Sequence, residues 1–212
     1  MRIKGSGTVE RGSSLPCKER NGSSRYDADI KRACETLRRG GVILYPTDTV
    51  WGIGCDATNA EAVAKVYALK HREDSKAVIC LVDSMARLSR YVRDIPSVAW
   101  DIVETATTPV TIIYDGAVGL APNVVADDGS VAVRVTAEEF SRQLCYRFQK
   151  PIVSTSANIS GQPTAQNFRD ISPELIEAVD YVCTGRRQEK LPHRPSSIIR
   201  LRPDGQVTVI RK

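Results

Sequence analysis

Residues 150–163, KPIVSTSANISGQP, decide how the fold of this 212-residue chain is interpreted. The stretch begins like a buried strand at Pro151, Ile152 and Val153 and continues into a dense run of hydroxyl and amide side chains. Serine, asparagine and glycine favour turns, but a plain connection needs only about two to five residues. The stretch is therefore either a solvated loop or a cradle of small donors that holds an anion.

Segments on both sides of this stretch alternate between helical and strand-like patterns. Apolar spacing and capping residues predict helices at 27–39, after Asn59, and at 85–91, 97–104, 137–148 and 173–178. Short apolar runs predict strands at 42–46, 77–82, 110–114, 131–135, 151–153, 181–183, 196–201 and 207–212, with PDG at 203–205 as a hairpin turn. This alternation predicts a single α/β (α+β) domain, in which helices flank a twisted mixed sheet.

Composition narrows the class of protein. Apolar residues make up 42% and charged residues 26% of the chain, as in ordinary globular proteins. No apolar run approaches the ~18 residues of a membrane span. The six cysteines form no C-x-x-C pair, which favours free thiols, no zinc, and a reducing cytoplasmic location. The net charge of +5 weakly favours anionic partners, nucleotides or nucleic acids.

The first 25 residues differ from the rest of the chain. They lack apolar periodicity and the apolar core of a secretory signal, and they are rich in glycine, serine and charge. We expect residues 1–25 to be disordered or vector-derived and residues 26–212 to form the folded domain.

Two further polar stretches follow predicted strands or helices, where open α/β sheets bind ligands. In YPTDTVWGIGCD (45–56), Thr47, Asp48 and Thr49 offer hydrogen-bonding groups, although a turn anchored by Trp51 is an equal alternative. In LKHREDSK (69–76), three cations occur within seven residues, although cations at a helix C-terminus also complement the helix dipole. Both stretches are candidates for binding a phosphorylated ligand.

Arg134 is a fourth candidate, because it lies inside the apolar run SVAVRV (130–135). A buried charge is costly unless it is paired. Arg134 therefore meets either a carboxylate of the protein or a carboxylate of a ligand, to which its planar fork is suited.

Several common catalytic arrangements are missing from the sequence. The only two histidines, His71 and His193, do not accompany a credible nucleophile, and no G-x-S-x-G elbow, P-loop or G-x-G-x-x-G fingerprint occurs. A protein that handles phosphates without these motifs must use dispersed side chains. Such a site acts by positioning and charge stabilisation, without a covalent intermediate.

Taken in order, these stretches resemble the YrdC-like family of L-threonylcarbamoyladenylate synthases over residues 27–212. The family's K-x-R and S-x-N motifs occur here as Lys70-His71-Arg72 and Ser156-Ala157-Asn158. The other matching stretches are GGVILYPTDTVWGIGCDA, TPVTIIY, SVAVRV, KPIVSTSANISGQP and SSIIRL. Each tripeptide is common by chance, whereas the ordered set is specific.

The resemblance implies the YrdC-like fold and a nucleotidyltransferase that converts L-threonine, bicarbonate and ATP into threonylcarbamoyl-AMP and pyrophosphate. This would be the first step of t6A formation in tRNAs that read ANN codons, and t6A transferase proteins would use the product. Magnesium would accompany ATP, with no protein ligand assigned. By position in the motifs, the catalytic residues would be Lys70, Arg72, Ser156 and Asn158; threonine would contact Thr49, Arg134 and Ser154; and ATP would contact Lys70, Arg72, Lys76, Ser130, Ser156, Asn158, Thr164 and Arg211.

A second hypothesis remains open at this stage. The fold also suits a non-catalytic module that binds tRNA, rRNA or double-stranded RNA, because the chain has excess lysine and arginine. Such binding would depend on phosphate contacts and on salt, and not on threonine. The aromatic content of 6% provides few stacking platforms for single-stranded RNA, so we favour the enzyme.

Overall fold

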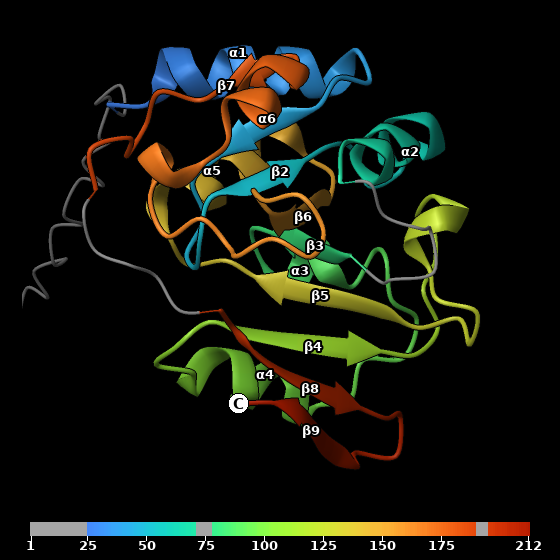
Figure 1. Cartoon of the computed structure of the whole chain (residues 1–212). Coiled ribbons are helices and arrows are strands. Elements are labelled where there is room, and N and C mark those ends of the chain that lie inside the picture. The colour runs from blue at the N-terminus through green and yellow to red at the C-terminus, as the bar shows by residue number, and fades with distance from the viewer. Residues whose placement is uncertain (1–24, 71–77, 190–194) are drawn as a thin grey trace, which may run out of the picture.

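The computed structural model of the chain describes residues 25–70, 78–189 and 195–212 (Figure 1). These residues form a nine-stranded sheet with the strand order β7-β1-β2-β6-β3-β5-β4-β8-β9. The strands are β1 (Ile43–Tyr45), β2 (Gly52–Gly54), β3 (Ile79–Val82), β4 (Val110–Tyr114), β5 (Val131–Val135), β6 (Ile152–Ser156), β7 (Tyr181–Val182), β8 (Ser197–Leu201) and β9 (Val207–Arg211). The pairs β1–β7, β3–β5 and β4–β8 are parallel and the others antiparallel, which confirms the mixed sheet.

The predicted helices are confirmed, with ends that differ by a few residues. The α-helices are α1 (Asp27–Arg38), α2 (Ala60–Leu69), α3 (Met85–Leu88), α4 (Val98–Thr105), α5 (Glu139–Phe148) and α6 (Pro173–Ala178), and the 3-10 turns are η1 (Pro122–Val124) and η2 (Phe168–Asp170). Asn59 caps α2 as predicted, because its side chain accepts a hydrogen bond from the amide of Ala62.

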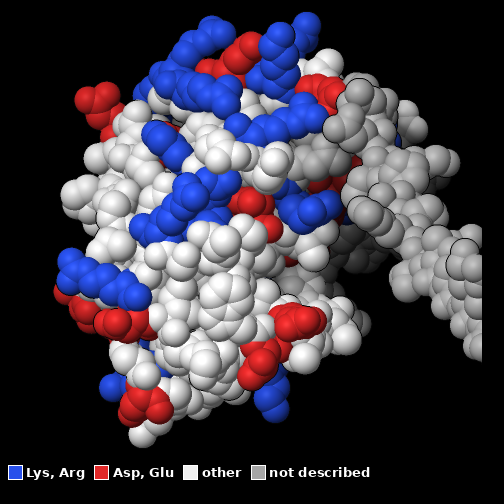
Figure 2. Space-filling model, turned by 180° about the vertical axis from the view of Figure 1, so that it is seen from behind, with Lys and Arg blue, Asp and Glu red and all other residues white. Residues whose placement is uncertain are grey.

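Helices α1 and α5 pack on one face of the sheet. Their apolar residues meet Ile43, Tyr45, Leu81 and Ile152 from the central strands. The outer side of this helical layer is rich in cations, which Figure 2 shows from behind. The exposed cations of the two helices are Lys31, Arg32, Arg38, Arg142 and Arg147.

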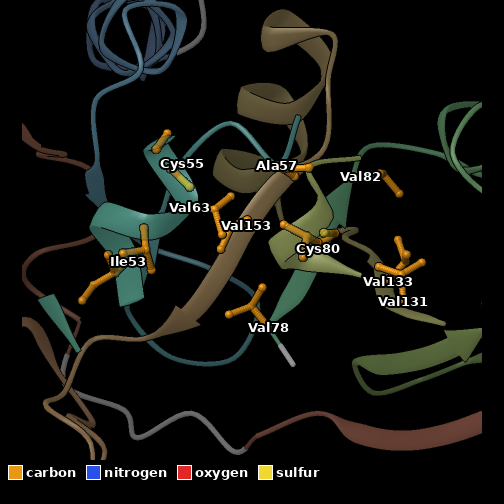
Figure 3. Close-up of a cluster of buried hydrophobic side chains, with 14 of the residues drawn as sticks. Ile53, Cys55, Ala57, Val63, Val78, Cys80, Val82, Val131, Val133 and Val153 are labelled. Carbon is orange, nitrogen blue, oxygen red and sulfur yellow. The ribbon is translucent and has the colours of Figure 1, made fainter. Parts of the chain in front are cut away.

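The main core lies on the opposite face of the sheet, where α2, α3, α4 and α6 pack. Alternate residues of the strands point into it, including Cys80, Val133 and Val153 (Figure 3). Cys80 and Cys55 behave here as small buried side chains, as expected for a thiol within an apolar run. The cysteines of the described residues are free, buried thiols: Cys34, Cys55, Cys80, Cys145 and Cys183.

Strand β2 is a correction to the sequence interpretation, which assigned its residues to a loop. Its sequence is Gly52-Ile53-Gly54, and glycine has low strand propensity. A Cβ atom at Gly54 would lie 2.5 Å from the carbonyl oxygen of Val153 and 2.7 Å from the ring of Tyr45. The close approach of β1, β2 and β6 therefore requires glycine there, and tertiary packing overrides propensity.

The end of β6 is a second correction. The strand predicted at 151–153 continues through Ser154, Thr155 and Ser156. Ser154 lies opposite Ile79 of β3, and Thr155 lies opposite Ile53 of β2. Because β6 has a neighbour on each side, ladder hydrogen bonds outweigh the turn preference of its serines. The polar stretch is therefore half strand and half turn.

Two sequence predictions fall mainly outside the described residues. The disordered or vector-derived segment proposed for residues 1–25 is described only at Arg25. Most of the cationic stretch 69–76 also lies outside, apart from Leu69 and Lys70. No helix within the described ranges combines the length and hydropathy needed to cross a membrane.

Candidate active site

A cleft of about 340 Å³ lies on the sheet face that α1 and α5 only partly cover. Ile79, Ala132, Ile113 and Ile198 from neighbouring strands form its floor. The predicted site residues that line it are Thr49, Arg134, Ser154, Ser156, Thr164 and Arg211. Arg134 lies within β5, as the sequence predicted, whereas Ser154, which was expected beyond the end of a strand, lies within β6.

Arg134 is buried at one end of the cleft, with 4% of its side chain exposed. Its Nη2 donates to Thr49 Oγ1 at 3.3 Å and lies 3.0 Å from Asp48 Oδ1. Its Nε is buried without a hydrogen-bond partner, and Asp48 Oδ1 also lacks one, so the ion pair is close but poorly aligned. The sequence predicted that Arg134 meets a carboxylate of either the protein or a ligand. The structure shows the protein carboxylate, Asp48, and leaves the Nε donor of Arg134 without a partner.

The Asp48 carboxyl is buried beside Arg134. Burial raises its pKa above the usual 3.8, and Glu138 adds to this, whereas Arg134 and Thr136 oppose it by stabilising the ionised form. The sequence interpretation noted Asp48 as a polar residue but gave it no role. An acid two residues after Pro46, which follows β1, was the available signal, but its partner Arg134 lies on β5.

Thr47 shapes the turn that carries Asp48 and Thr49. Its hydroxyl donates to the carbonyl of Val50 at 2.7 Å and accepts from the amide of Thr49 at 3.1 Å. The hydroxyls of Thr47 and Thr49 are 3.0 Å apart. This local network directs Thr49 Oγ1 toward Arg134.

Lys70, Ser156 and Asn158 form a second polar cluster. Lys70 is only 3% exposed, and its Nζ donates to the carbonyl of Ser156 at 2.5 Å and to Asn158 Oδ1 at 3.2 Å. Ser156 Oγ donates to the same Asn158 oxygen at 2.5 Å. The alternative of a solvated cation at a helix end is wrong for Lys70, because α2 directs it into the polar turn after β6.

Arg211 reaches the cleft through an irregularity in β9. Ile198 lies opposite Arg211 and Ile199 opposite Val209, so Ile210 is an extra residue on β9. In a regular strand Arg211 would share a face with Val209, but the bulge places it opposite Ile198, which lines the cleft. Its Nη2 then donates to the carbonyl of Ser196 at 2.7 Å.

Three described site residues are not part of this lining: Lys70 and Asn158, which contact the lining residue Ser156, and Ser130, which lies apart. The Ser130 hydroxyl donates to Asp128 Oδ1 at 2.6 Å, and together with Arg200 it lowers the pKa of Asp128 to about 2. Ser130 directly precedes β5, the strand that carries Arg134. Arg72 and Lys76 lie outside the described residues.

A metal site built from protein ligands is not evident in the part of the chain that the structure describes. No group of three or more His, Cys, Asp or Glu side chains there is arranged to hold an ion. Asp48, the carboxylate nearest Arg134, faces that cation.

Comparison with known sequences identifies relatives over most of the chain. The profile of the Sua5/YciO/YrdC family, described as "Telomere recombination", matches residues 35–212. The threonylcarbamoyl-AMP synthase of Pseudoalteromonas translucida is 36% identical over 155 residues, which cover 72% of this chain and 83% of that protein. The threonylcarbamoyl-AMP synthase of Vibrio cholerae O395 is 33% identical over 173 residues, covering 80% of this chain and 91% of that protein.

Solved structures share the fold. The structure of P. abyssi Sua5 complexed with L-threonine superposes with a TM-score of 0.72 at 24% identity, covering 81% of this chain and 50% of that chain. E. coli YciO superposes with a TM-score of 0.74 at 24% identity, covering 86% of this chain and 88% of that chain. At this identity the likeness establishes the α/β architecture.

Proposed function

The chain belongs to the Sua5/YciO/YrdC family, and on this premise we propose that it is a threonylcarbamoyl-AMP synthase. The reaction converts L-threonine, bicarbonate and ATP into threonylcarbamoyl-AMP and pyrophosphate, the first step of t6A formation in tRNAs that read ANN codons. Relatives that are 33–36% identical carry this enzyme name. The class of reaction is nucleotidyl transfer.

The single observation that carries this proposal is the unused donor of Arg134. A buried guanidinium whose Nε lacks a partner leaves a polar group unsatisfied, which is costly unless a ligand completes it. A carboxylate suits the planar fork. The carboxylate of threonine would bind Arg134, with Thr49 and Ser154 contacting the same substrate.

The nucleotide would occupy the other end of the cleft. Ser156 lines the cleft there together with Thr164 and Arg211. Lys70 and Asn158 adjoin it through their hydrogen bonds with Ser156 and would add a cation and an amide. Arg72, Lys76 and Ser130 would add contacts by their position in the family motifs. Magnesium would enter with ATP, bound by phosphate oxygens.

The reaction needs alignment more than covalent help from the protein. The amine of threonine combines with bicarbonate, with loss of water, to give a carbamate. A carbamate oxygen attacks the α-phosphorus, the bond to the β-phosphate oxygen breaks, and pyrophosphate leaves. Cations that offset the charge developing on the α-phosphate lower the barrier, and holding the two reactants in line removes the entropic cost of their encounter.

The test is pyrophosphate release by the purified protein, with threonine or bicarbonate omitted in turn. Release that requires both, together with a product of the mass of threonylcarbamoyl-AMP, is the expected result. Release that ignores threonine, or none at all with a folded protein, would contradict the proposal.

RNA binding is the second candidate, favoured by one observation. The outer side of α1 and α5 carries a concentration of exposed lysine and arginine (Figure 2). A folded protein that lacks synthase activity but binds double-stranded RNA or tRNA, with affinity falling steeply as salt rises, would favour this function.

A further inference from the structure

Arg186 contacts the turn that carries Asp48 and Thr49, although it belongs to a different part of the chain. Its Nη1 donates to the carbonyl of Thr47 at 2.8 Å and lies 3.1 Å from Glu138 Oε1. Only 12% of its side chain is exposed. Arg186 thus joins the backbone of the 47–49 turn to a partly buried carboxylate.

Glu138 continues the connection toward β5. Its carboxylate caps α5 by accepting from the amides of Phe140 at 2.9 Å and Ser141 at 2.8 Å. Ser141 Oγ donates to Glu138 Oε2 and lies 2.8 Å from the hydroxyl of Thr136, the residue that follows β5. Arg186 and Arg134 are therefore linked on two sides, through the 47–49 turn and through Glu138, Ser141 and Thr136.

The turn after β7 fixes where Arg186 lies. The amides of Thr184 and Gly185 donate to the buried Asp29 Oδ2 at 2.8 and 2.7 Å. A Cβ atom at Gly185 would lie 2.8 Å from the ring of Phe140, so only glycine brings this turn against α5. Arg186 itself has φ of 56°, which non-glycine residues rarely adopt. Such a conformation persists only when the surroundings enforce it.

We propose that Arg186 is a positioning residue for the substrate-carboxylate site: by holding the Thr47 carbonyl it fixes Asp48 and Thr49 against Arg134. This inference rests on the proposed function. Arg186 is not among the residues that line the cleft, and its guanidinium faces the Thr47 carbonyl and the carboxylates of Glu138 and Glu189. It acts on the carboxylate end and leaves the Lys70 cluster untouched, which predicts a selective effect on threonine.

Arg187 provides a matched control. It is the next residue, and its Nε and Nη2 each donate at 2.7 Å to a carbonyl oxygen, those of Cys183 and Val182. Its guanidinium also lies 4.8 Å from the ring centroid of Phe168. Replacing Arg187 removes an arginine with two backbone hydrogen bonds and no described contact to the 47–49 turn, whereas Arg186 also forms ion pairs with Glu138 and Glu189.

The first experiment measures threonine and ATP KM by pyrophosphate release for the wild type, Arg186→Gln, Arg186→Lys and Arg187→Gln. Arg186→Gln should raise the threonine KM roughly ten- to a hundredfold, since a displacement of about 1 Å has effects of this size. The ATP KM should change little. Arg186→Lys should recover part of the loss, because a lysine still reaches one acceptor, and Arg187→Gln should alter neither KM.

The second experiment does not depend on activity. The side-chain Nε–H resonance of Arg134, assigned by its loss in Arg134→Lys, is followed by ¹⁵N NMR in the same variants. Arg186→Gln should shift or broaden this resonance, whereas Arg187→Gln should not. If Arg186→Gln does not fold, Glu138→Gln, which weakens the same link, takes its place.

The outcomes separate the two proposals. An inactive wild type with a shifted Arg134 resonance in Arg186→Gln would overturn the synthase and retain the positioning role. An unchanged resonance together with an unchanged threonine KM would overturn the positioning role. Equal effects of the Arg186 and Arg187 variants on threonine KM would also overturn it, since general destabilisation would then explain both.

Discussion

The two ends of the cleft are built in different ways. At the Arg134 end, a cation on β5 meets an acid from the turn after β1, and a second arginine after β7 holds that turn. At the Lys70 end, Ser156 is the last residue of β6 and Asn158 lies two residues later, in the turn that follows. Lys70 follows the last residue of α2 and donates to Asn158. The first end is assembled from distant segments, and the second is mostly local.

This difference also concerns charge. Asp48 lies beside Arg134, so a substrate carboxylate arrives where a protein carboxylate is already present. Lys70 donates to a carbonyl and to an amide oxygen, which orient its ammonium group in the turn after β6. The Arg134 end is therefore suited to selecting one carboxylate, whereas the Lys70 end presents a cation, a hydroxyl and an amide together. Four predictions test this contrast.

Arg134→Ala is expected to have the largest effect. Removing the cation leaves Asp48 buried and uncompensated, which should lower the free energy of unfolding by about 3–5 kcal/mol. Threonine binding should weaken by about 2–5 kcal/mol, with the ATP KM much less affected. Arg134→Lys should retain only part of the threonine affinity, because the point charge of an ammonium group does not reproduce the two parallel donors of a guanidinium. Urea unfolding and threonine KM are the measurements.

Adding Asp48→Asn to Arg134→Ala separates the two roles of the arginine. The double variant should regain stability, because the uncompensated charge is gone, but it should not regain threonine binding. Recovery of both together would mean that Arg134 serves only the ion pair.

Lys70→Ala should mainly affect catalysis. If Lys70 offsets charge on the transferring phosphate, its loss should cost about 2–4 kcal/mol of transition-state stabilisation, or roughly thirty- to a thousandfold in rate. Asn158→Ala should act in the same direction, and the double variant should lose less than the sum of the two. Turnover is measured at saturating threonine and bicarbonate.

Lys65 is the control for Lys70. It lies on the same helix, and its Nζ donates to the carbonyl of Gly40 at 2.9 Å, away from the cleft. Lys65→Ala should leave turnover unchanged. Normal turnover in Lys70→Ala would remove the phosphate role and favour RNA binding.

Arg211→Ala should have a moderate effect on ATP. Its guanidinium is on the exposed wall of the cleft, so a lost charge-assisted contact should cost about 1–2 kcal/mol, or roughly five- to thirtyfold in ATP KM. Deleting Ile210 removes the extra residue but keeps Arg211 opposite Ile198, so the ATP KM should change much less. A larger effect of the deletion than of Arg211→Ala would show that the bulge itself shapes the site.

The smallest expected effect is a pH dependence of stability from Asp48. Its folded pKa lies above 3.8, mainly because the carboxyl is buried. For a raised pKa, the contribution to the free energy of unfolding is fully present below the unfolded value and is lost as pH rises through the folded value. Urea unfolding from about pH 3.5 upward should therefore show a flatter profile for Asp48→Asn than for the wild type. Parallel profiles would contradict the raised pKa.

The features that could be predicted from the sequence are those set by residues close together in the chain. The helices, most strands and the PDG turn were predictable, because apolar periodicity, capping and turn preferences involve residues only a few positions apart. Strand β2 was not predictable, because glycine disfavours strands. Glycine is required at position 54 only by its close packing against Val153 and Tyr45, which the sequence does not reveal. The extension of β6 through Ser156 was missed for the same reason, since pairing with β2 and β3 decides it.

The candidate site divides in the same way. From the sequence alone came the mixed α/β fold, the apolar strands, the family resemblance and the local group of Ser156 and Asn158. The tertiary structure alone decided that Arg134 pairs with Asp48, that Arg186 holds the Thr47 carbonyl, and that a bulge directs Arg211 toward the cleft. Propensity and spacing act along a few residues of chain, whereas these contacts join strands whose order and register are set only when the whole sheet packs between its two layers of helices.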